Sequence, residues 1–363
     1  MTEKKVFKPE VIAFYLPQYH EIPENNRWWG EGFTEWTNVK KARPLFDGHE
    51  QPVEPGELGY YNLLDPEIRI RQATLAKEHG ITAFCYWHYW FGNGRMLLEK
   101  PFQQVLESGE PDFPFCLGWA NESWTGIWHG SPDKVLMEQT YPGKHDIINH
   151  FEYLLPAFLD DRYLKVDGKP FFLVYRPYNH PDLNMFVDTF SELAVEAGFK
   201  GIHFVATNVR EDWDLDSAGF AAIAPSYHHG ILWRRKKSWL DRLKETFSSA
   251  DTTSIFTYEE ASRYFLPKNV RKGKFYPVVV PNWDNSPRLG EKGVIFTGSS
   301  PEKYRLHVEQ ALHYARENGG EHPVVMVKSW NEWAEGNYLE PDKKWGRAFL
   351  EVTREVLEKY TEL

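Results

Sequence analysis

The chain has 363 residues, a formal net charge of −10, and 15 Trp, 19 Tyr and 24 Phe. Its acidic balance, without a basic stripe, argues against nucleic acid or an anionic membrane surface as the main partner. The only cysteines, Cys85 and Cys116, each lie inside an apolar run, which excludes a disulfide framework and predicts buried thiols.

No apolar segment approaches the roughly 18 residues of a transmembrane helix, so we expect no membrane span. The first residues, Met1 to Val6, also lack the apolar core of a secretory signal. We therefore expect a cytoplasmic protein. A secreted or periplasmic protein whose signal had been trimmed would show the same sequence.

Short apolar runs recur along the chain and are separated by amphipathic stretches with helix-capping residues. The predicted strands are residues 11–16, 81–86, 113–119, 169–175, 202–206, 221–225, 275–280 and 323–327. The predicted helices are residues 66–79, 97–107, 146–159, 183–197, 239–247, 258–265, 301–317 and 345–360. Asp65 followed by Pro66 is a typical helix start, and Gly319 with Gly320 is a typical helix end.

The predicted strands are continuously apolar, which is expected when helices cover both faces of a parallel sheet. Eight such units predict an α/β fold, a single (β/α)8 TIM barrel that spans residues 1–363. An open doubly wound sheet is the alternative. Because the chain exceeds the ~250 residues typical of the fold, we assign the surplus to residues 17–64 and 227–274. We interpret both as long βα-loop insertions at the C-terminal face.

Aromatic and polar residues gather where the predicted strands end. In a barrel these ends converge on the face that carries the active site. Loop polarity explains Asn and Asp there, but not Trp or Tyr at seven of the eight ends. Aromatic rings stack on sugar rings and polar side chains bind hydroxyls, so the pattern predicts a sugar-binding groove. The predicted substrate-binding residues are Tyr15, His20, Trp36, Trp87, His88, Trp90, Trp119, Asn121, Glu122, Tyr175, Arg176, Asn208, Tyr227, His228, Asn282, Trp283, Trp330, Asn331, Trp333 and Glu340.

Glu332 and Glu335, just after the last predicted strand, are the predicted catalytic residues. If the turn there is helical, their spacing of three places them on one face. Glycoside cleavage needs one group to protonate the departing oxygen and a second carboxylate to assist at the anomeric carbon. The flanking Trp330 and Trp333 would desolvate an acid and raise its pKa. The alternative is that one of the two is a solvated loop residue.

Other chemistries find little support in the sequence. It contains no His-Glu-x-x-His, Cys-x-x-Cys, Walker or Gly-x-Ser-x-Gly motif. The histidines are scattered, so we expect no metal and no cofactor. Asp212-Trp213-Asp214 supplies the Asp-x-Asp pattern of metal-dependent glycosyltransferases. A sugar-binding protein without catalysis is a further alternative, against which the close acid pair argues.

Five segments combine aromatic and polar residues in a distinctive way: residues 14–20, 28–36, 86–91, 119–122 and 329–336. Together they resemble the WbsX family over nearly the whole chain. That family is similar to glycoside hydrolase family 99, the endo-α-1,2-mannosidases and mannanases. The likeness to the mannosidases rests on the barrel and on Asn331-Glu332-Trp333-Ala334-Glu335-Gly336, followed by Glu340-Pro341.

The resemblance implies a retaining glycoside hydrolase (a glycosidase), endo-acting on an α-linked glycan that is mannan-like or another bacterial or host polysaccharide. It implies that Glu332 deprotonates the sugar's own 2-hydroxyl, which attacks the anomeric carbon and gives a 1,2-anhydro sugar. Glu335 would act first as acid and then as base. Most other loops, including residues 28–36, depart from the mannosidases, so mannose itself is not implied. Because the family name comes from surface-polysaccharide gene clusters, a glycosyltransferase of lipopolysaccharide or O-antigen assembly is the alternative.

Overall fold

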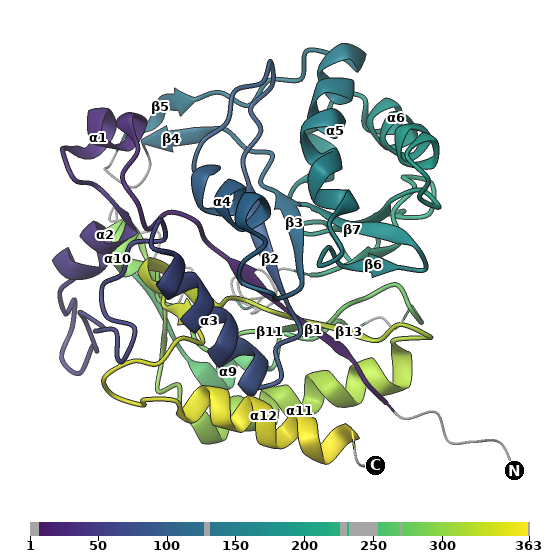
Figure 1. The fold of residues 1–363 in the computed structure, drawn as a ribbon. Coiled ribbons are helices and arrows are strands. Elements are labelled where there is room, and N and C mark those ends of the chain that lie inside the picture. Colours follow the sequence, from purple (N-terminus) through teal and green to yellow (C-terminus); the bar gives the residue numbers. More distant parts are fainter. Residues whose placement is uncertain (1–6, 127–130, 226–230, 232–252, 269–270, 362–363) are drawn as a thin grey trace, which may run out of the picture.

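The computed structural model describes residues 7–126, 131–225, 231, 253–268 and 271–361. Its centre is a curled parallel sheet with the strand order β11-β13-β1-β2-β3-β7-β8-β9 (Figure 1). The strands of this path are β1 (Glu10–Tyr15), β2 (Ala83–His88), β3 (Phe115–Trp119), β7 (Lys169–Val174), β8 (His203–Ala206), β9 (Ala222–Ile223), β11 (Val278–Val279) and β13 (Val324–Val327). β6 (Lys165–Val166) pairs antiparallel with β7 off this path. The prediction of an α/β fold with eight parallel strands is thereby confirmed.

The two ends of the strand path approach each other. Ile223 of β9 forms a parallel bridge with Phe275, three residues before β11 begins. Its amide donates to the Lys274 carbonyl at 2.8 Å, and its carbonyl accepts from the Tyr276 amide at 2.9 Å. The sheet is therefore curled in the manner of a TIM barrel.

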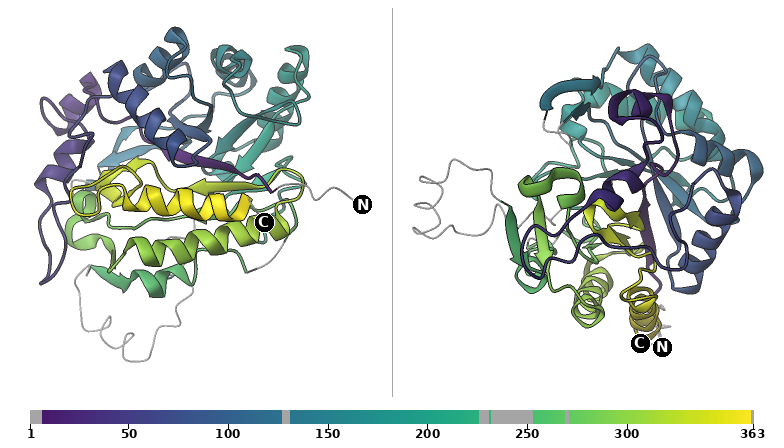
Figure 2. Two further views of the ribbon diagram at one scale, coloured as in Figure 1. Left: turned by 60° about the horizontal axis from the view of Figure 1, so that its bottom comes forward. Right: turned by 90° about the vertical axis from the view of Figure 1, so that its left-hand side faces the viewer.

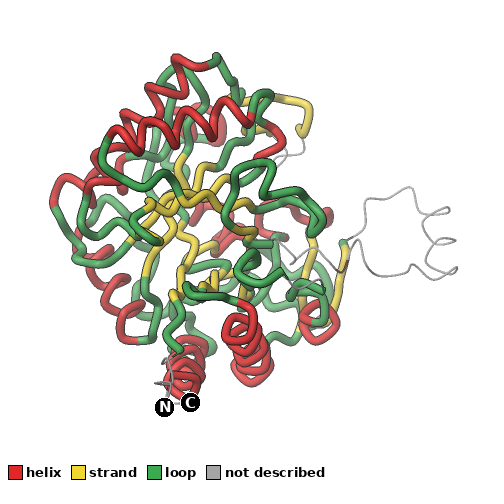
Figure 3. Tube along the Cα trace, turned by 90° about the vertical axis from the view of Figure 1, so that its right-hand side faces the viewer, coloured by secondary structure: helices red, strands yellow, loops and turns green. Residues whose placement is uncertain are grey.

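Helices cover the outside of the sheet, so that strands lie in the middle and helices surround them (Figure 3). These helices are α3 (Pro66–Glu78), α4 (Lys100–Ser108), α5 (Lys144–Leu159), α6 (Leu183–Glu196), α11 (Pro301–Asn318) and α12 (Ala348–Thr361). The predicted cap at Asp65 is present, because its carboxylate accepts from the Glu67 amide at 3.0 Å. α11 and α12 pack side by side (Figure 2). All six residues of β2 are buried, as expected for a sheet covered on both faces.

Smaller elements occupy the connections and were not predicted from the sequence, apart from a helix at residues 258–265. The short helices are α1 (Pro23–Trp29), α2 (Glu35–Lys41), α9 (Tyr258–Ser262), α10 (Ser286–Leu289), η2 (Pro177–Asn179), η4 (Gly290–Lys292) and η5 (Trp333–Glu335). Three two-stranded sheets pair β4 (Trp124–Gly126) with β5 (Ser131–Met137), β10 (Ser254–Thr257) with β12 (Val294–Thr297), and β14 (Asn331–Glu332) with β15 (Asn337–Tyr338). These strands have two to seven residues, and only β12, with the sequence Val-Ile-Phe-Thr, has an apolar run like those of the central strands.

Some predicted boundaries shift. β2 begins and ends two residues later than predicted, because its pairing with β3 continues as far as His88 opposite Trp119. Cys85 and Cys116 lie opposite each other in these strands and are fully buried, which confirms the prediction of buried thiols. The predicted helix 239–247 lies outside the described residues. Across the part of the chain that is described, no helix is both long and apolar enough to cross a membrane.

Candidate active site

The two predicted catalytic acids lie on a tight hairpin beyond β13. Asn331 pairs with Tyr338 and Glu332 with Asn337, and the 3-10 helix η5 connects the two short strands. The Trp333 and Tyr338 rings stack with centroids 3.9 Å apart. This hairpin fixes the backbone of both acids.

Gly336 closes the hairpin and is required there for two reasons. Its φ of +64° lies in the left-handed region that disfavours side chains. A Cβ at this position would also lie 2.7 Å from the Asp284 backbone nitrogen, which donates to the Glu335 carbonyl at 2.8 Å. The glycine thus permits the close approach that ties Glu335 to the segment after β11.

One arginine joins the two acids to a third. Arg288 of α10 donates from Nε to Glu35 Oε1 at 2.7 Å and from Nη1 to Glu335 Oε1. Its Nη2 lies 3.6 Å from Glu332 Oε2. The Glu332 carboxylate also accepts from Trp87 Nε1 at 3.1 Å. We call Glu35, Arg288, Glu332 and Glu335 the acid cluster.

The two acids of the hairpin have different electrostatic environments. Burial, followed by the charge of Glu335, raises the pKa of Glu332 to about 7. Burial also disfavours the charged form of Glu335, but the charges of Arg288 and Lys328 outweigh it and hold the pKa of Glu335 below its usual value. The two shifts are opposite in direction, so protonation of Glu332 is favoured over protonation of Glu335.

Arg288 and Glu35 are site residues that sequence reasoning missed or ranked low. The Glu35 side chain is 0% exposed and comes from α2, in the long segment after β1. Arg288 follows β11 within Ser286-Pro287-Arg288-Leu289. A signal was available in principle, since three buried carboxylates require a cation among them. The sequence alone does not show that the three are close.

Several predicted substrate-binding residues form a continuous path from Glu332. The Trp87 ring meets the Tyr175 ring edge-on at 5.6 Å. The Arg176 guanidinium lies 5.5 Å from the centroid of the Tyr175 ring and pairs with Glu122 at 3.3 Å. The Glu122 and Arg176 side chains are 40% and 39% exposed, so their polar groups are accessible. Asn121 fixes this turn by bonding the amide and carbonyl of Arg176, both at 2.8 Å.

A second group of predicted residues packs inside the protein around Glu340. The buried Glu340 carboxylate accepts hydrogen bonds from Trp333 Nε1 at 2.6 Å, Tyr61 Oη at 2.8 Å and Gln72 Nε2 at 2.6 Å. Tyr15 Oη donates to Gln72 Oε1 at 2.7 Å. The polar groups of Glu340, Trp333 and Tyr15 are thus bonded within the protein and stabilise the base of the hairpin.

Trp36, Trp330 and Asn331 belong to the same buried layer. Trp36 Nε1 donates to the Tyr61 carbonyl at 2.8 Å. The Asn331 side chain accepts from the Leu16 amide at 2.7 Å and donates to the Leu16 carbonyl at 3.0 Å. Trp330 is fully buried. The Trp330 ring packs against Phe84 of β2, and the Trp36 ring packs against Trp333. Their contact with a sugar stays a prediction.

The predicted histidines and tryptophans at the ends of β1, β2 and β3 also bond to protein groups. His20 bonds the Pro17 carbonyl at 3.0 Å, and the Nε2 atoms of His88 and His150 lie 2.9 Å apart. The Trp90 indole donates to the Asp146 carboxylate, and the Trp119 indole donates to the Trp90 carbonyl. All four predicted residues, His20, His88, Trp90 and Trp119, are buried.

The remaining predicted residues are dispersed. Trp283 is buried beneath Lys328, whose Nζ lies 5.5 Å from its ring centroid. Asn208 is half-buried after β8, and Asn282 lines a separate cavity described below. Tyr227 and His228 lie outside the described residues. Within the described part of the chain, no group of three or more His, Cys, Asp or Glu side chains is arranged to hold a metal ion.

Solved structures with a similar fold include glycoside hydrolases. The GH99 endo-alpha-mannosidase from Bacteroides thetaiotaomicron superposes with a TM-score of 0.58 at 15% identity, covering 97% of this chain and 98% of that one. A protein described as glycoside hydrolase-like gives a TM-score of 0.58 at 13% identity, over 98% and 96% of the two chains. At these identities the likeness concerns the fold.

Sequence comparison identifies the family. Two curated relatives from Xanthomonas campestris pv. campestris, both described as uncharacterized protein WxcX, are 37% identical over 348 residues, or 96% of this chain. The chain spans about half the length of these relatives, 49% in each case. The family model described as Glycosyltransferase WbsX matches residues 11–353. The chain therefore belongs to the WbsX family, as the motifs around the acid pair and the strand ends had indicated.

Proposed function

We propose that this chain is a retaining glycoside hydrolase that cleaves an α-linked glycan with Glu332 and Glu335. The observation that carries the proposal is the pair itself, two carboxylates on one hairpin, Glu332 buried and Glu335 half-buried, both beside Arg288. A proton donor beside an ionised carboxylate is what glycoside cleavage requires. The GH99 fold likeness supports this reading. We further propose that residues 1–363 form one (β/α)8 catalytic domain, with residues 17–64 and 227–274 as insertions at its mouth.

In the proposed reaction, one carboxylate takes the proton of the substrate's 2-hydroxyl, and O2 attacks C1 as the bond from C1 to the leaving oxygen breaks. The other acid gives its proton to that leaving oxygen. A water molecule then adds at C1, giving its proton to the acid that had become a carboxylate. The C1–O2 bond breaks, and O2 recovers its proton from the first carboxyl. The product keeps the configuration at C1.

The charge environment bears on which acid has which role. By resemblance Glu332 is the base and Glu335 the acid, but the pKa of Glu332 is raised by burial and that of Glu335 is lowered by Arg288, which favours the opposite order in the free protein. Either the proton passes from Glu332 to Glu335 when substrate binds, or the two roles are exchanged in this chain. Both arrangements use the same pair and the same single proton.

Glu122 and Arg176, beyond Trp87 and Tyr175, are the proposed contacts for hydroxyls of the bound glycan. They are accessible and lie at the carboxyl ends of β3 and β7. The aromatic rings between them and Glu332 offer faces and edges to a sugar ring. We propose that these residues contact an oligosaccharide or polysaccharide.

The second proposed function is that of a glycosyltransferase in lipopolysaccharide or O-antigen assembly, which the name of the matching family model favours. The contacts of Asp212 and Asp214 give little support to the Asp-x-Asp pattern as a metal site. Asp212 pairs with Arg210 at 2.9 Å, Asp214 bonds Ser217 at 2.7 Å, and both aspartates are exposed.

A screen of defined glycans and nucleotide sugars separates the two functions. The hydrolase reading predicts cleavage of at least one α-linked oligosaccharide without any added nucleotide sugar. Saturable binding of a nucleotide sugar by calorimetry, together with glycan elongation and no cleavage, would establish the transferase instead.

A further inference from the structure

Next to the acid cluster, the described residues line a cavity of about 490 Å³. Asp284 and Gly336 line it, whereas Glu332 and Glu335 do not. Its volume lies within the roughly 300–1,000 Å³ typical of small-molecule sites. We call it the side pocket.

The side pocket is built from three loop segments that follow neighbouring strands. Residues 48–54 follow β1, residues 281–299 follow β11 and residues 336–349 follow β13. These strands are adjacent in the order β11-β13-β1 and run parallel. Their carboxyl ends therefore lie on the same side of the sheet. It follows that the segments lining the side pocket and those carrying the acid cluster leave the sheet at the same end.

The lining of the side pocket combines aromatic surface with hydrogen-bonding groups. Tyr338 and Trp345 contribute half-buried rings. Asn282, Thr297 and Ser299 contribute amide and hydroxyl groups. The Asn282 side-chain oxygen is buried and finds no hydrogen-bond partner among the described residues. A buried acceptor of this kind is costly unless a ligand or water donates to it.

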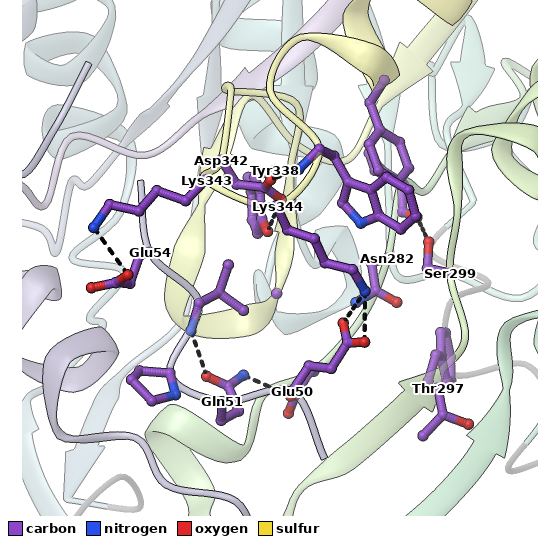
Figure 4. Close-up of a pocket in the computed structure, with 18 of the residues that line it drawn as sticks. Glu50, Gln51, Glu54, Asn282, Thr297, Ser299, Tyr338, Asp342, Lys343 and Lys344 are labelled. Carbon is purple, nitrogen blue, oxygen red and sulfur yellow. Dashed lines mark hydrogen bonds and ion pairs between the residues drawn. The ribbon is translucent and has the colours of Figure 1, made fainter. Parts of the chain in front are cut away.

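Both lysines of the side pocket are paired with glutamates, and Asp284, Glu340 and Asp342 add further carboxylates to its lining. Lys343 Nζ lies 3.0 Å from Glu54, and Lys344 Nζ lies 2.6 Å from Glu50. Figure 4 shows both pairs crossing between their two loops, with Thr297 and Ser299 on the far side of the Lys344–Glu50 pair from Lys343. A phosphate-bearing ligand such as a nucleotide would have to compete with these glutamates for the lysines. A neutral, hydroxyl-rich ligand would not.

We propose that the side pocket is a second carbohydrate-binding site, which takes one or two neutral sugar units of a glycan. The inference rests on the proposed function for the choice of a glycan, but its evidence is the pocket's own lining. The sugar ring would stack on Trp345 or Tyr338, and a hydroxyl would donate to Asn282. Because the Asp284 amide in its wall donates to the Glu335 carbonyl at 2.8 Å, the site adjoins the acid cluster.

Binding measurements in the full chain test this inference without requiring turnover. The probe is a panel of neutral mono- to tetrasaccharides of mannose, glucose, galactose and their N-acetyl amines, titrated against a Glu335→Gln variant. We expect saturable binding of at least one member. We also expect a shift of the Trp345 indole NMR signal, which is identified by its loss in Trp345→Phe.

Adding Trp345→Ala should weaken that binding at least tenfold, while Trp345→Phe keeps the aromatic face and should restore most of it. Tyr60→Ala is the matched control, because this aromatic is 41% exposed and does not line the side pocket. Thermal melting checks that each variant is folded. No binding by any member, or equal binding with and without Trp345→Ala, would overturn the inference.

The outcomes distinguish this inference from the proposed function. Cleavage of a glycan by the wild-type chain with no dependence on Trp345 would refute the side pocket and keep the hydrolase. Trp345-dependent binding without cleavage of any glycan would refute the hydrolase and keep the side pocket. Displacement of the bound sugar by inorganic phosphate or a nucleoside diphosphate at the Trp345 signal would overturn the assignment of a neutral ligand.

Discussion

Arg288 Nε donates to Glu35 Oε1 at 2.7 Å, and this contact joins two residues that are 253 positions apart. It connects α2, which follows β1, to α10, which follows β11. The same guanidinium reaches both acids of the β14–β15 hairpin. The segment after β1 therefore contributes a residue, Glu35, to the acid cluster.

Replacing Glu35 with alanine should destabilise the protein and lower its activity. The Glu35 side chain is 0% exposed and Arg288 is 6% exposed, so the change leaves a buried cation with one partner fewer. Breaking such a pair costs roughly 3 kcal/mol, which urea denaturation would measure. The control is Glu31→Ala, an exposed glutamate of the same segment, which should lie within about 0.5 kcal/mol of the wild type. Equal unfolding midpoints for both variants would show that the contact has no structural role.

The acid pair predicts a bell-shaped dependence of activity on pH. The active form carries one proton, so the pair titrates as a unit. Activity should fall as pH rises through about 7, where Glu332 loses its proton. Activity should also fall at low pH, where Glu335 becomes protonated. Because the pKa of Glu335 is lowered, this loss should occur below pH 4.5, the usual pKa of a glutamate.

Arg288→Gln should move this profile to higher pH. The guanidinium lowers the pKa of both acids, and it contacts Glu335 directly while lying 3.6 Å from Glu332. The acid limb should therefore shift more than the alkaline limb. A profile of unchanged position and lower height would mean that Arg288 is only structural.

Substrates with activated leaving groups would assign the two roles. Such a leaving group needs no proton, so the variant that lacks the acid keeps activity on an aryl glycoside, while the variant that lacks the base loses it on every substrate. The resemblance predicts that Glu335→Gln is the variant that keeps activity. If Glu332→Gln keeps it instead, the roles follow the charge environment of the free protein.

Gly336→Ala should destabilise the hairpin that carries the acids. The new Cβ would meet the Asp284 backbone nitrogen at 2.7 Å in addition to the strain of a φ of +64°. We expect a loss of about 1–3 kcal/mol. Gly109→Ala is the matched control, since its φ of +74° and ψ of 1° lie in the same left-handed region as the φ of +64° and ψ of 12° of Gly336, but nothing lies within 4 Å of its Cβ. Similar thermal shifts for the two variants would show that the contact with Asp284 adds nothing to the backbone strain.

The parallel strands and the position of the acid pair could be predicted from the sequence because they depend on local patterns. An apolar run such as residues 323–327 identifies a buried strand, and two acids three residues apart after its end are recognisable as a candidate catalytic pair. Arg288 and Glu35 have no local pattern. Their importance comes from a contact between α2 and α10, which follow β1 and β11, the two strands on either side of β13.

The aromatic residues show a second limit. Tryptophans at strand ends predicted a sugar-binding surface, yet Trp330 and Trp333 are buried, and the Trp333 indole bonds Glu340. Trp87, by contrast, donates to Glu332. Neighbouring positions along a strand point to opposite faces. All six residues of β2 are buried, so its sequence does not show which of the two alternating sets of side chains faces the site.

The most direct test is cleavage of the glycan found in the screen by the wild type and by Glu332→Gln and Glu335→Gln variants, with NMR following the anomeric configuration of the first product. Glu317→Gln, on the exposed surface of α11, is the control. We predict retention by the wild type and by the control. On natural leaving groups, each site variant should show a loss of about 10²–10⁴-fold or more, with unchanged thermal stability. Near-full activity of both site variants, or an inverted product, would contradict the account.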